Sequence, residues 1–334
     1  MIARLFDGVS RRTLVLLAIL LAALLIAPAL HSDYVLTVLI LFLYFAYVGQ
    51  AWNIMMGFAG QLSLGHSLYV GLGAYAAAAL YIHFSIGPWI GLFAAIVISS
   101  LCGAAMGFLA FRFRVSGVYF AILTIAFAEF ARLGFDHFGW VGASAGFFLP
   151  VAQYTQNDLW RLRGNPAMFY YILLAATVLV FIACRLLLQS RIGYFWRAIR
   201  EDEEAARAAG INAFRYKMIA VVISAALTSF AGVFYAFFYN NLFPEQIFHI
   251  SRSIEFILGP IIGGIGTLFG PVLGAFVLQV LAEALRSLLV MLGIDVPGVK
   301  QLVFGVFLLF VVMLMPDGIW PRLAKMLGVT EKQP

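Results

Sequence analysis

The chain has 334 residues, of which 64% are hydrophobic and 11% charged, and its formal net charge is +6. Soluble domains carry about 25% charged residues, so this chain has too little polar surface for a water-soluble protein. The composition excludes a soluble enzyme and, despite the basic excess, a nucleic-acid-binding protein. It predicts an all-α polytopic integral membrane protein.

Uncharged stretches define the predicted membrane spans, because a bilayer core of about 30 Å requires about 20 apolar residues per helix. The first span, 13–30, follows Arg11 and Arg12 and lacks a small-residue cleavage site, which favours a retained anchor over a signal peptide. Further spans are predicted at 34–56, 60–82, 88–111, 115–135, 166–189 and 214–239, with two more within 254–293 and a last one at 300–316. This amounts to about ten transmembrane helices.

Glycine-rich stretches interrupt two of these regions. The glycines at 60–65 and those at 263–271, the latter ending in Gly270-Pro271, predict broken or re-entrant segments. The apolar run 254–293 is too long for one helix, and the sequence leaves open whether it makes one or two crossings. Close packing of helices through small residues is the alternative explanation for these glycines.

Basic residues predict the orientation of the chain, because cytoplasmic loops of membrane proteins are enriched in Lys and Arg. With the N-terminus inside, 15 of the 21 basic residues fall in inner segments and five in outer ones, while Arg286 lies within a span. We therefore expect cytoplasmic tails at 1–12 and 319–334, a transmembrane domain at 13–318, and a cytoplasmic segment at 190–213.

The sequence does not predict metal or cofactor chemistry. Cys102 and Cys184 lie far apart in apolar runs, which excludes a disulfide framework, and the five histidines have no spacing typical of metal ligands. No GxxxxGK[ST] phosphate-binding loop occurs, so any nucleotide-driven step requires another chain. We expect no catalytic residue and no cofactor bound by this chain.

Two acid–base pairs fall inside predicted spans, where ionisable groups are costly. Glu129 with Arg132 and Glu283 with Arg286 have i,i+3 spacing, so each pair is expected to neutralise itself on one helix. A substrate-contact role is the alternative. No unpaired carboxylate is expected deep in a span, which argues against a proton-driven carrier.

Residues 197–210 predict a short alanine-rich amphipathic helix that ends at Gly210. The helix lies in the most charged segment of the chain, on the predicted cytoplasmic side. The i,i+4 pairs Arg200 with Glu204 and Glu203 with Arg207 are expected to stabilise it. A solvated surface helix without a partner is the alternative.

Several motifs resemble those of known transport proteins. Glu204-Ala205-Ala206 followed by Gly210 resembles the signature of ABC-transporter permeases, whose cytoplasmic coupling helix sits in a groove of the ATPase subunit. Other stretches are similar, in order and spacing, to the LivM-type branched-chain amino acid permeases: Gly60 to His66, Gly71 to Tyr75, Tyr119 to Ala126, Gly263 to Ala275 and Pro316 to Gly318. The chain departs from the family at 141–146, so a role of that loop in substrate choice is not carried over.

The resemblance implies the permease subunit of an ABC importer for branched-chain or related hydrophobic amino acids, in the bacterial cytoplasmic (inner) membrane. The implied partners are two ABC ATPase subunits that use ATP and Mg, a second permease that is LivH-like or a second copy, and a periplasmic or surface amino-acid-binding protein. A permease for urea or short-chain amides is one alternative, and a stand-alone secondary carrier is another from a different class. The amino acid carried stays open.

Two groups of site residues are predicted, the first from the resemblance and the second from the glycine-rich breaks. The coupling residues toward the ATPase are Arg200, Glu203, Glu204, Ala205, Ala206, Arg207 and Gly210. The predicted substrate pathway follows the two glycine-rich breaks, whose free N–H groups would face the carboxylate of a passing amino acid. Its predicted residues are Gln61, Ser63, Gly65, His66, Thr124, Gly263, Gly264, Gly266 and Thr267.

Overall fold

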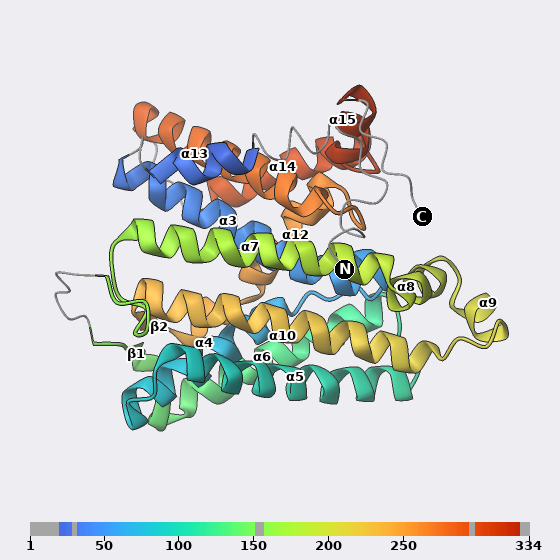
Figure 1. Cartoon of the computed structure of the whole chain (residues 1–334), viewed down its shortest axis with the longest axis horizontal. Coiled ribbons are helices and arrows are strands. Elements are labelled where there is room, and N and C mark those ends of the chain that lie inside the picture. The colour runs from blue at the N-terminus through green and yellow to red at the C-terminus, as the bar shows by residue number, and fades with distance from the viewer. Residues whose placement is uncertain (1–19, 29–31, 151–156, 294–297, 328–334) are drawn as a thin grey trace. The chain divides into compact units, whose positions relative to one another are not determined.

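The computed structural model of the chain describes residues 20–28, 32–150, 157–293 and 298–327, most of which are helical (Figure 1). The predicted tail 1–12 and most of the first predicted span lie outside the described residues, and 20–28 of that span are helical. The described residues fall into two compact units. Unit 1 comprises residues within 1–50, 170–186 and 258–334, and unit 2 comprises residues within 51–169 and 187–257.

Seven helices of the described part are long and apolar enough to cross a membrane. They confirm the predicted spans between 34 and 239 and the larger part of the run 254–293. Their bounds are α3 (Asp33–Asn53) continued by the π-helical turn η1 (Ile54–Phe58), α4 (His66–Phe84), α5 (Pro88–Arg112), α6 (Val118–His137), α7 (Pro166–Gln189), α10 (Ala213–Tyr239) and α13 (Gly270–Leu292).

The remaining predicted spans coincide with shorter helices. The run 254–293 is divided into α12 (Ile250–Gly263) and α13, with non-helical residues 264–269 between them. The last predicted span forms α14 (Val299–Leu314), and the predicted C-terminal tail begins with α15 (Ile319–Leu327). The 14 residues of α12 extend only about 21 Å at 1.5 Å per residue, which is less than the thickness of a bilayer core.

Unit 2 is built around α4, α5 and α10, which pack against one another through small residues. A Cβ on Gly91 of α5 would lie 3.1 Å from the Cα of Ala77 on α4, and one on Gly103 would lie 3.0 Å from the Cβ of Ala225 on α10. A side chain on Gly73 would overlap the backbone carbonyl of Ser229. The glycines therefore allow the helix backbones to approach closely, as is typical of membrane helices.

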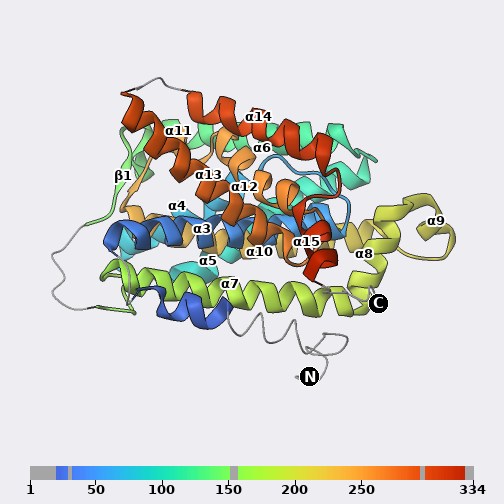
Figure 2. The same ribbon diagram turned by 90° about the horizontal axis from the view of Figure 1, so that it is seen from above.

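The two ends of unit 2 carry different elements (Figures 1 and 2). At one end, β1 (Phe147–Phe148) and β2 (Asn241–Leu242) form an antiparallel pair, and α11 (Pro244–Ile247) follows β2. At the opposite end lie α8 (Arg191–Glu201) and α9 (Glu203–Ala208). The segment 190–213, which is predicted to be cytoplasmic, and residues 241–247 after α10 thus lie at opposite ends of this unit.

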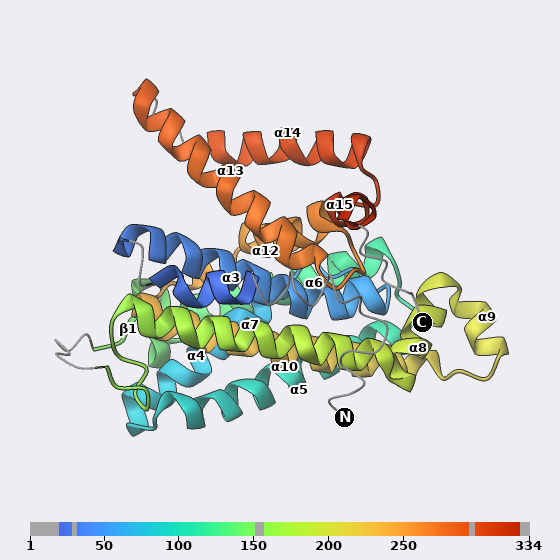
Figure 3. The same ribbon diagram turned by 45° about the horizontal axis from the view of Figure 1, so that its top comes forward.

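Unit 1 contains α13, α14 and α15 together with α3 as far as Gln50. Figure 3 shows α13 and α14 inclined to each other. Together with α12, they bury an apolar cluster of Leu258, Ile262, Leu278, Phe304 and Val311.

Candidate functional site

The predicted coupling segment, residues 190–213, contains the two helices α8 and α9, so the prediction of one helix over 197–210 is wrong. The chain leaves α8 at Asp202, which adopts an extended conformation and caps the N-terminus of α9. One carboxylate oxygen of Asp202 accepts hydrogen bonds from the backbone N–H groups of Glu204 and Ala205, both at 2.9 Å. An Asp followed by two glutamates is a typical N-terminal helix signal, and this signal could have located the break from the sequence.

Gly210 ends α9 in the predicted way. Its φ of +87° lies in the left-handed region, which glycine adopts without strain. Its N–H donates to the carbonyl of Arg207 at 2.9 Å, and the N–H of Ile211 donates to the carbonyl of Ala206 at 3.0 Å. The side chain of Asn212 then caps α10, so the chain turns from α9 into α10 within a few residues.

Glu203 joins the coupling segment to α10. The predicted ion pair between Glu203 and Arg207 is confirmed, and the second oxygen of Glu203 lies 2.8 Å from the ammonium of Lys217. The Lys217 side chain is only 5% exposed, and its ammonium lies 4.7 Å from the centroid of the Phe111 ring. Glu203 is therefore the carboxylate that compensates a buried cation at the start of α10.

Arg200 joins α8 to η1. The predicted Arg200–Glu204 ion pair is wrong, since in the described part of the chain these side chains form no such pair, and Arg200 donates instead to the backbone carbonyl of Gly57. The contact is close at Gly60 as well, where a Cβ would lie 3.3 Å from the Cα of Arg200. A movement of α8 would therefore displace Gly57 and Gly60, at the start of the first glycine-rich break.

The coupling segment exposes three carboxylates that form no ion pair in the described residues, and it also exposes Arg200 and Arg207. The side chains of Glu201, Asp202 and Glu204 are exposed, together with Ala205. Ala206, by contrast, is buried against a small cluster formed with Ile199 and Ala213. The two alanines of the motif therefore have different roles, since Ala206 seats α9 on its own unit and Ala205 lies on the free face beside Glu204.

Predicted pathway residues of unit 2 meet at the break between η1 and α4. His66, the first residue of α4, is fully buried, with Nδ1 3.2 Å from the Ser63 hydroxyl and Nε2 2.9 Å from the Ser224 hydroxyl. The Ser224 hydroxyl donates to the carbonyl of Ala51, and because a hydroxyl has a single proton, it accepts from His66. The imidazole proton is therefore on Nε2, and Ser63 donates to Nδ1.

The backbone of this break is hydrogen-bonded within the chain. The N–H groups of Gly60 and Gln61 donate to the carbonyls of Met56 and Met55, and that of Leu64 donates to the Thr124 hydroxyl of α6 at 2.9 Å. The N–H of Gly65 faces the Ser63 hydroxyl at 3.3 Å. The expected free N–H groups are thus not present at these positions, and a role for these residues in a substrate pathway stays a prediction.

The side chain of Thr267 stabilises the turn at the second break, residues 264–269 of unit 1. Its hydroxyl donates to the carbonyl of Gly264 at 2.8 Å and accepts from the N–H of Gly270 at 3.0 Å. Gly264 and Gly266 have φ values of +125° and +78°, which explains why glycine is required in this turn. Gly263 is the last residue of α12 and packs against the backbone of Gly270. The pathway role of these four residues likewise stays a prediction.

Of the two acid–base pairs predicted within spans, one is formed. Arg132 pairs with Glu129 at 2.6 Å, and it also lies 3.0 Å from Asp136 and 2.5 Å from Glu245. The predicted Glu283–Arg286 ion pair is wrong, since no such pair forms in the described residues.

Three polar residues with structural roles at these sites were not predicted. Ser224 accepts from His66, Lys217 pairs with Glu203, and Ser253 exchanges hydrogen bonds with Ser67 in the buried core of unit 2. Each partner lies at least 14 residues away along the chain, so the local sequence contains no spacing signal for the contact. A lysine or serine within an apolar helix was the only indication, because a polar group there requires a partner.

Comparison with known proteins identifies the family. Residues 34–312 match the family model described as the permease component of branched-chain amino acid transport systems. The chain belongs to this family. The permease is 28% identical over 295 residues to the LivM protein of Salmonella typhimurium, covering 82% of this chain and 67% of that protein, and 27% identical over 336 residues to the LivM protein of Escherichia coli, covering 94% and 76%.

The related LivH protein of Escherichia coli is 26% identical to the permease over 295 residues, covering 83% of this chain and 91% of LivH. All three relatives are named as permease proteins of high-affinity branched-chain amino acid transport systems. No solved structure matches the chain. The predicted family and the predicted all-α membrane fold are both confirmed.

Proposed function

We propose that the permease is the membrane subunit of an ABC importer for branched-chain or related hydrophobic amino acids. It works with a second permease, two cytoplasmic ATPases and an external binding protein, in the bacterial inner membrane with both termini inside. The named relatives support the substrate class. The distribution of basic residues supports the orientation, because it places α8 and α9 in the cytoplasm.

The coupling segment carries this proposal. It projects from one end of unit 2 (Figure 1), its outer face bears Glu201, Asp202 and Glu204, and Gly210 turns the chain back into α10. Exposed carboxylates that form no ion pair in the described residues, next to a helix of small residues, suit a groove with basic side chains on an ATPase. The segment is also anchored, through Glu203 to α10 and through Arg200 to η1, so a force on it reaches the membrane helices.

Transmission requires two arrangements of the same contacts, since a partner shifts an equilibrium only when it binds the two states differently. The contact of Arg200 with Gly57 and Gly60 is suited to this role, because it joins α8 to the start of a break in a membrane helix. ATP-driven closure of the ATPases would move α8 and thereby change the conformation at residues 59–65.

Vesicles that contain the permease, a second permease and the ATPases test the proposal. With the binding protein outside and ATP inside, we expect uptake of labelled leucine that isoleucine and valine reduce by competition, whereas urea and acetamide do not. Competition by urea instead would favour the amide permeases. Uptake by the purified permease alone would refute the proposal.

A further inference from the structure

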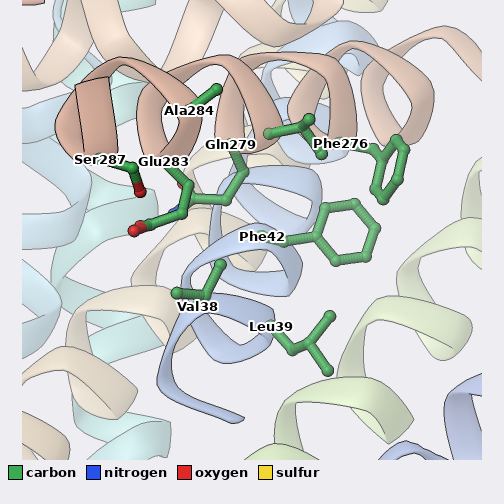
Figure 4. A pocket seen from close by; sticks show the side chains of 9 residues that line it. Val38, Leu39, Phe42, Phe276, Gln279, Glu283, Ala284 and Ser287 are labelled. Carbon is green, nitrogen blue, oxygen red and sulfur yellow. The ribbon is translucent and has the colours of Figure 1, made fainter. Parts of the chain in front are cut away.

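A groove opens between α3 and α13 within unit 1 (Figure 4). Its volume is about 370 Å³, which falls in the range of about 300–1,000 Å³ of small-molecule sites. Its polar lining comes from Gln279, Glu283 and Ser287 on α13, which recur every four residues and so share one face of the helix. Its apolar lining includes Val38, Leu39, Phe42, Phe276 and Val280.

The polar and apolar groups lie at different ends of the groove. In Figure 4 the carboxylate of Glu283 and the hydroxyl of Ser287 lie next to each other, and the rings of Phe42 and Phe276 lie at the other end. The two rings meet edge to face with their centroids 5.7 Å apart. The groove therefore presents a negative, hydrogen-bonding end and an aromatic, apolar end to one ligand.

Glu283 is not neutralised by its neighbour on the helix. It accepts a hydrogen bond at Oε1 from the hydroxyl of Tyr34, and Arg286 lies over the ring of Tyr34 with its guanidinium carbon 5.7 Å from the centroid. In the part of the chain described, the carboxylate forms no ion pair. Glu283 is nine residues, or about 14 Å, from the end of α13, inside a membrane-spanning helix. A carboxylate there is costly and indicates a functional site with a cationic partner.

We propose that this groove binds a hydrophobic amino acid, with the α-ammonium on the carboxylate of Glu283 beside the Ser287 hydroxyl and the aliphatic side chain against Phe42 and Phe276. The inference rests on the proposed function and adds a binding site for its substrate. A primary ammonium next to an aliphatic chain matches both ends of the groove. Phosphatidylethanolamine also carries a primary ammonium, so the experiment has to separate the two sources.

The test measures binding of labelled leucine to the full permease in nanodiscs of phosphatidylcholine, which has no primary amine. Two leucine analogues divide its chemistry: 3-methylbutylamine keeps the ammonium and the side chain, and 4-methylpentanoate keeps the carboxylate and the side chain. We expect the amine to displace leucine and the acid to be at least about tenfold weaker, the loss typical of a missing charge-assisted hydrogen bond.

Two variants separate ammonium binding from a structural role. Glu283→Gln keeps an oxygen that accepts from Tyr34 but loses the negative charge, and it should weaken leucine binding at least about tenfold. Tyr34→Phe removes only that hydrogen bond and should retain leucine binding. Glu245→Gln is the matched control, because Glu245 is exposed on α11 outside the groove and Arg132 keeps two other carboxylates.

Three results would overturn the inference. The first is leucine binding by Glu283→Gln at the wild-type level. The second is equal displacement of leucine by the acid and the amine. The third is absence of leucine binding to the wild-type chain, together with phosphatidylethanolamine that stays bound to the purified permease only when Glu283 is present. Each can be obtained while the complete importer still takes up leucine, in which case the proposed function stands. Failure of leucine uptake by the wild-type importer would count against the proposed function itself.

Discussion

The ion pair between Glu203 and Lys217 allows a quantitative test of how the coupling segment is attached. Replacing Glu203 with Gln leaves the Lys217 ammonium without its carboxylate, in a side chain that is 5% exposed. Loss of one partner from a buried pair costs about 3–5 kcal/mol. Glu203 is 27% exposed, and Lys217 keeps its contact with the Phe111 ring, so we expect a smaller cost of about 2–3 kcal/mol in the free energy of unfolding.

Replacing Lys217 with Met should lower the free energy of unfolding by less, about 1 kcal/mol or below. Glu203 keeps its ion pair with Arg207 and its contact with solvent, and the buried site receives an apolar side chain. The double variant should therefore be close to Lys217→Met in stability. The coupling energy between the two positions would then equal the cost of Glu203→Gln, about 2–3 kcal/mol, which is within the range for contacting residues.

The measurement is a double-mutant cycle of unfolding in detergent, with uptake and ATP hydrolysis of the assembled importer as the second readout. Glu201→Gln is the control, because Glu201 is exposed and forms no ion pair in the described residues; its effect should stay within about 0.5 kcal/mol. Costs that simply add in the double variant would show that the two side chains do not interact, and the proposed attachment of α9 to α10 would be wrong.

Three further predictions concern local geometry. Asp202→Ala should destabilise α9 by about 0.5–2 kcal/mol, whereas Asp202→Asn should retain the stability of α9 because its amide oxygen still caps the helix; equal loss of stability by the two variants would contradict the capping role. Glu204→Lys or Gly210→Pro should abolish uptake while membrane insertion stays intact, and unchanged uptake by both would contradict the coupling assignment. Ser224→Ala should lower the free energy of unfolding by about 1–3 kcal/mol, because it leaves the buried Nε2–H of His66 without an acceptor; an unchanged unfolding curve would refute the assigned proton position.

Local sequence patterns predicted some contacts of the coupling segment correctly and others not. The spacing of Glu203 and Arg207 and the glycine at 210 predicted a pair and a turn that the structure contains. The same rule failed for Arg200 and Glu204, because Asp202 interrupts the helix and the i,i+4 relation no longer holds. The prediction of an ion pair between Glu283 and Arg286 failed for a different reason. Here α13 is continuous, but Tyr34 from α3 contacts both side chains.

The glycine-rich breaks were predicted as interruptions, and residues 59–65 and 264–269 are indeed non-helical. Their hydrogen bonding was not predictable. A break in a helix predicts free N–H groups, but in the folded chain a side chain from another element can accept their hydrogen bonds. The Thr124 hydroxyl of α6 does so for the N–H of Leu64. The groove beside Glu283 could not be predicted either, because its walls come from helices more than 200 residues apart in the chain.

The sequence by itself determined that the chain is an α-helical membrane protein, where most of its helices lie, and which permease family it belongs to. These properties depend on apolar stretches long enough for a bilayer and on local motifs, both of which can be read residue by residue. Only the tertiary structure decided the partners of the polar groups, such as Ser224 for His66 at a separation of 158 residues, Gly57 for Arg200 at 143 and Tyr34 for Glu283 at 249. In an apolar interior each polar group takes whichever partner the packing of distant helices brings within reach, and that packing depends on the whole chain.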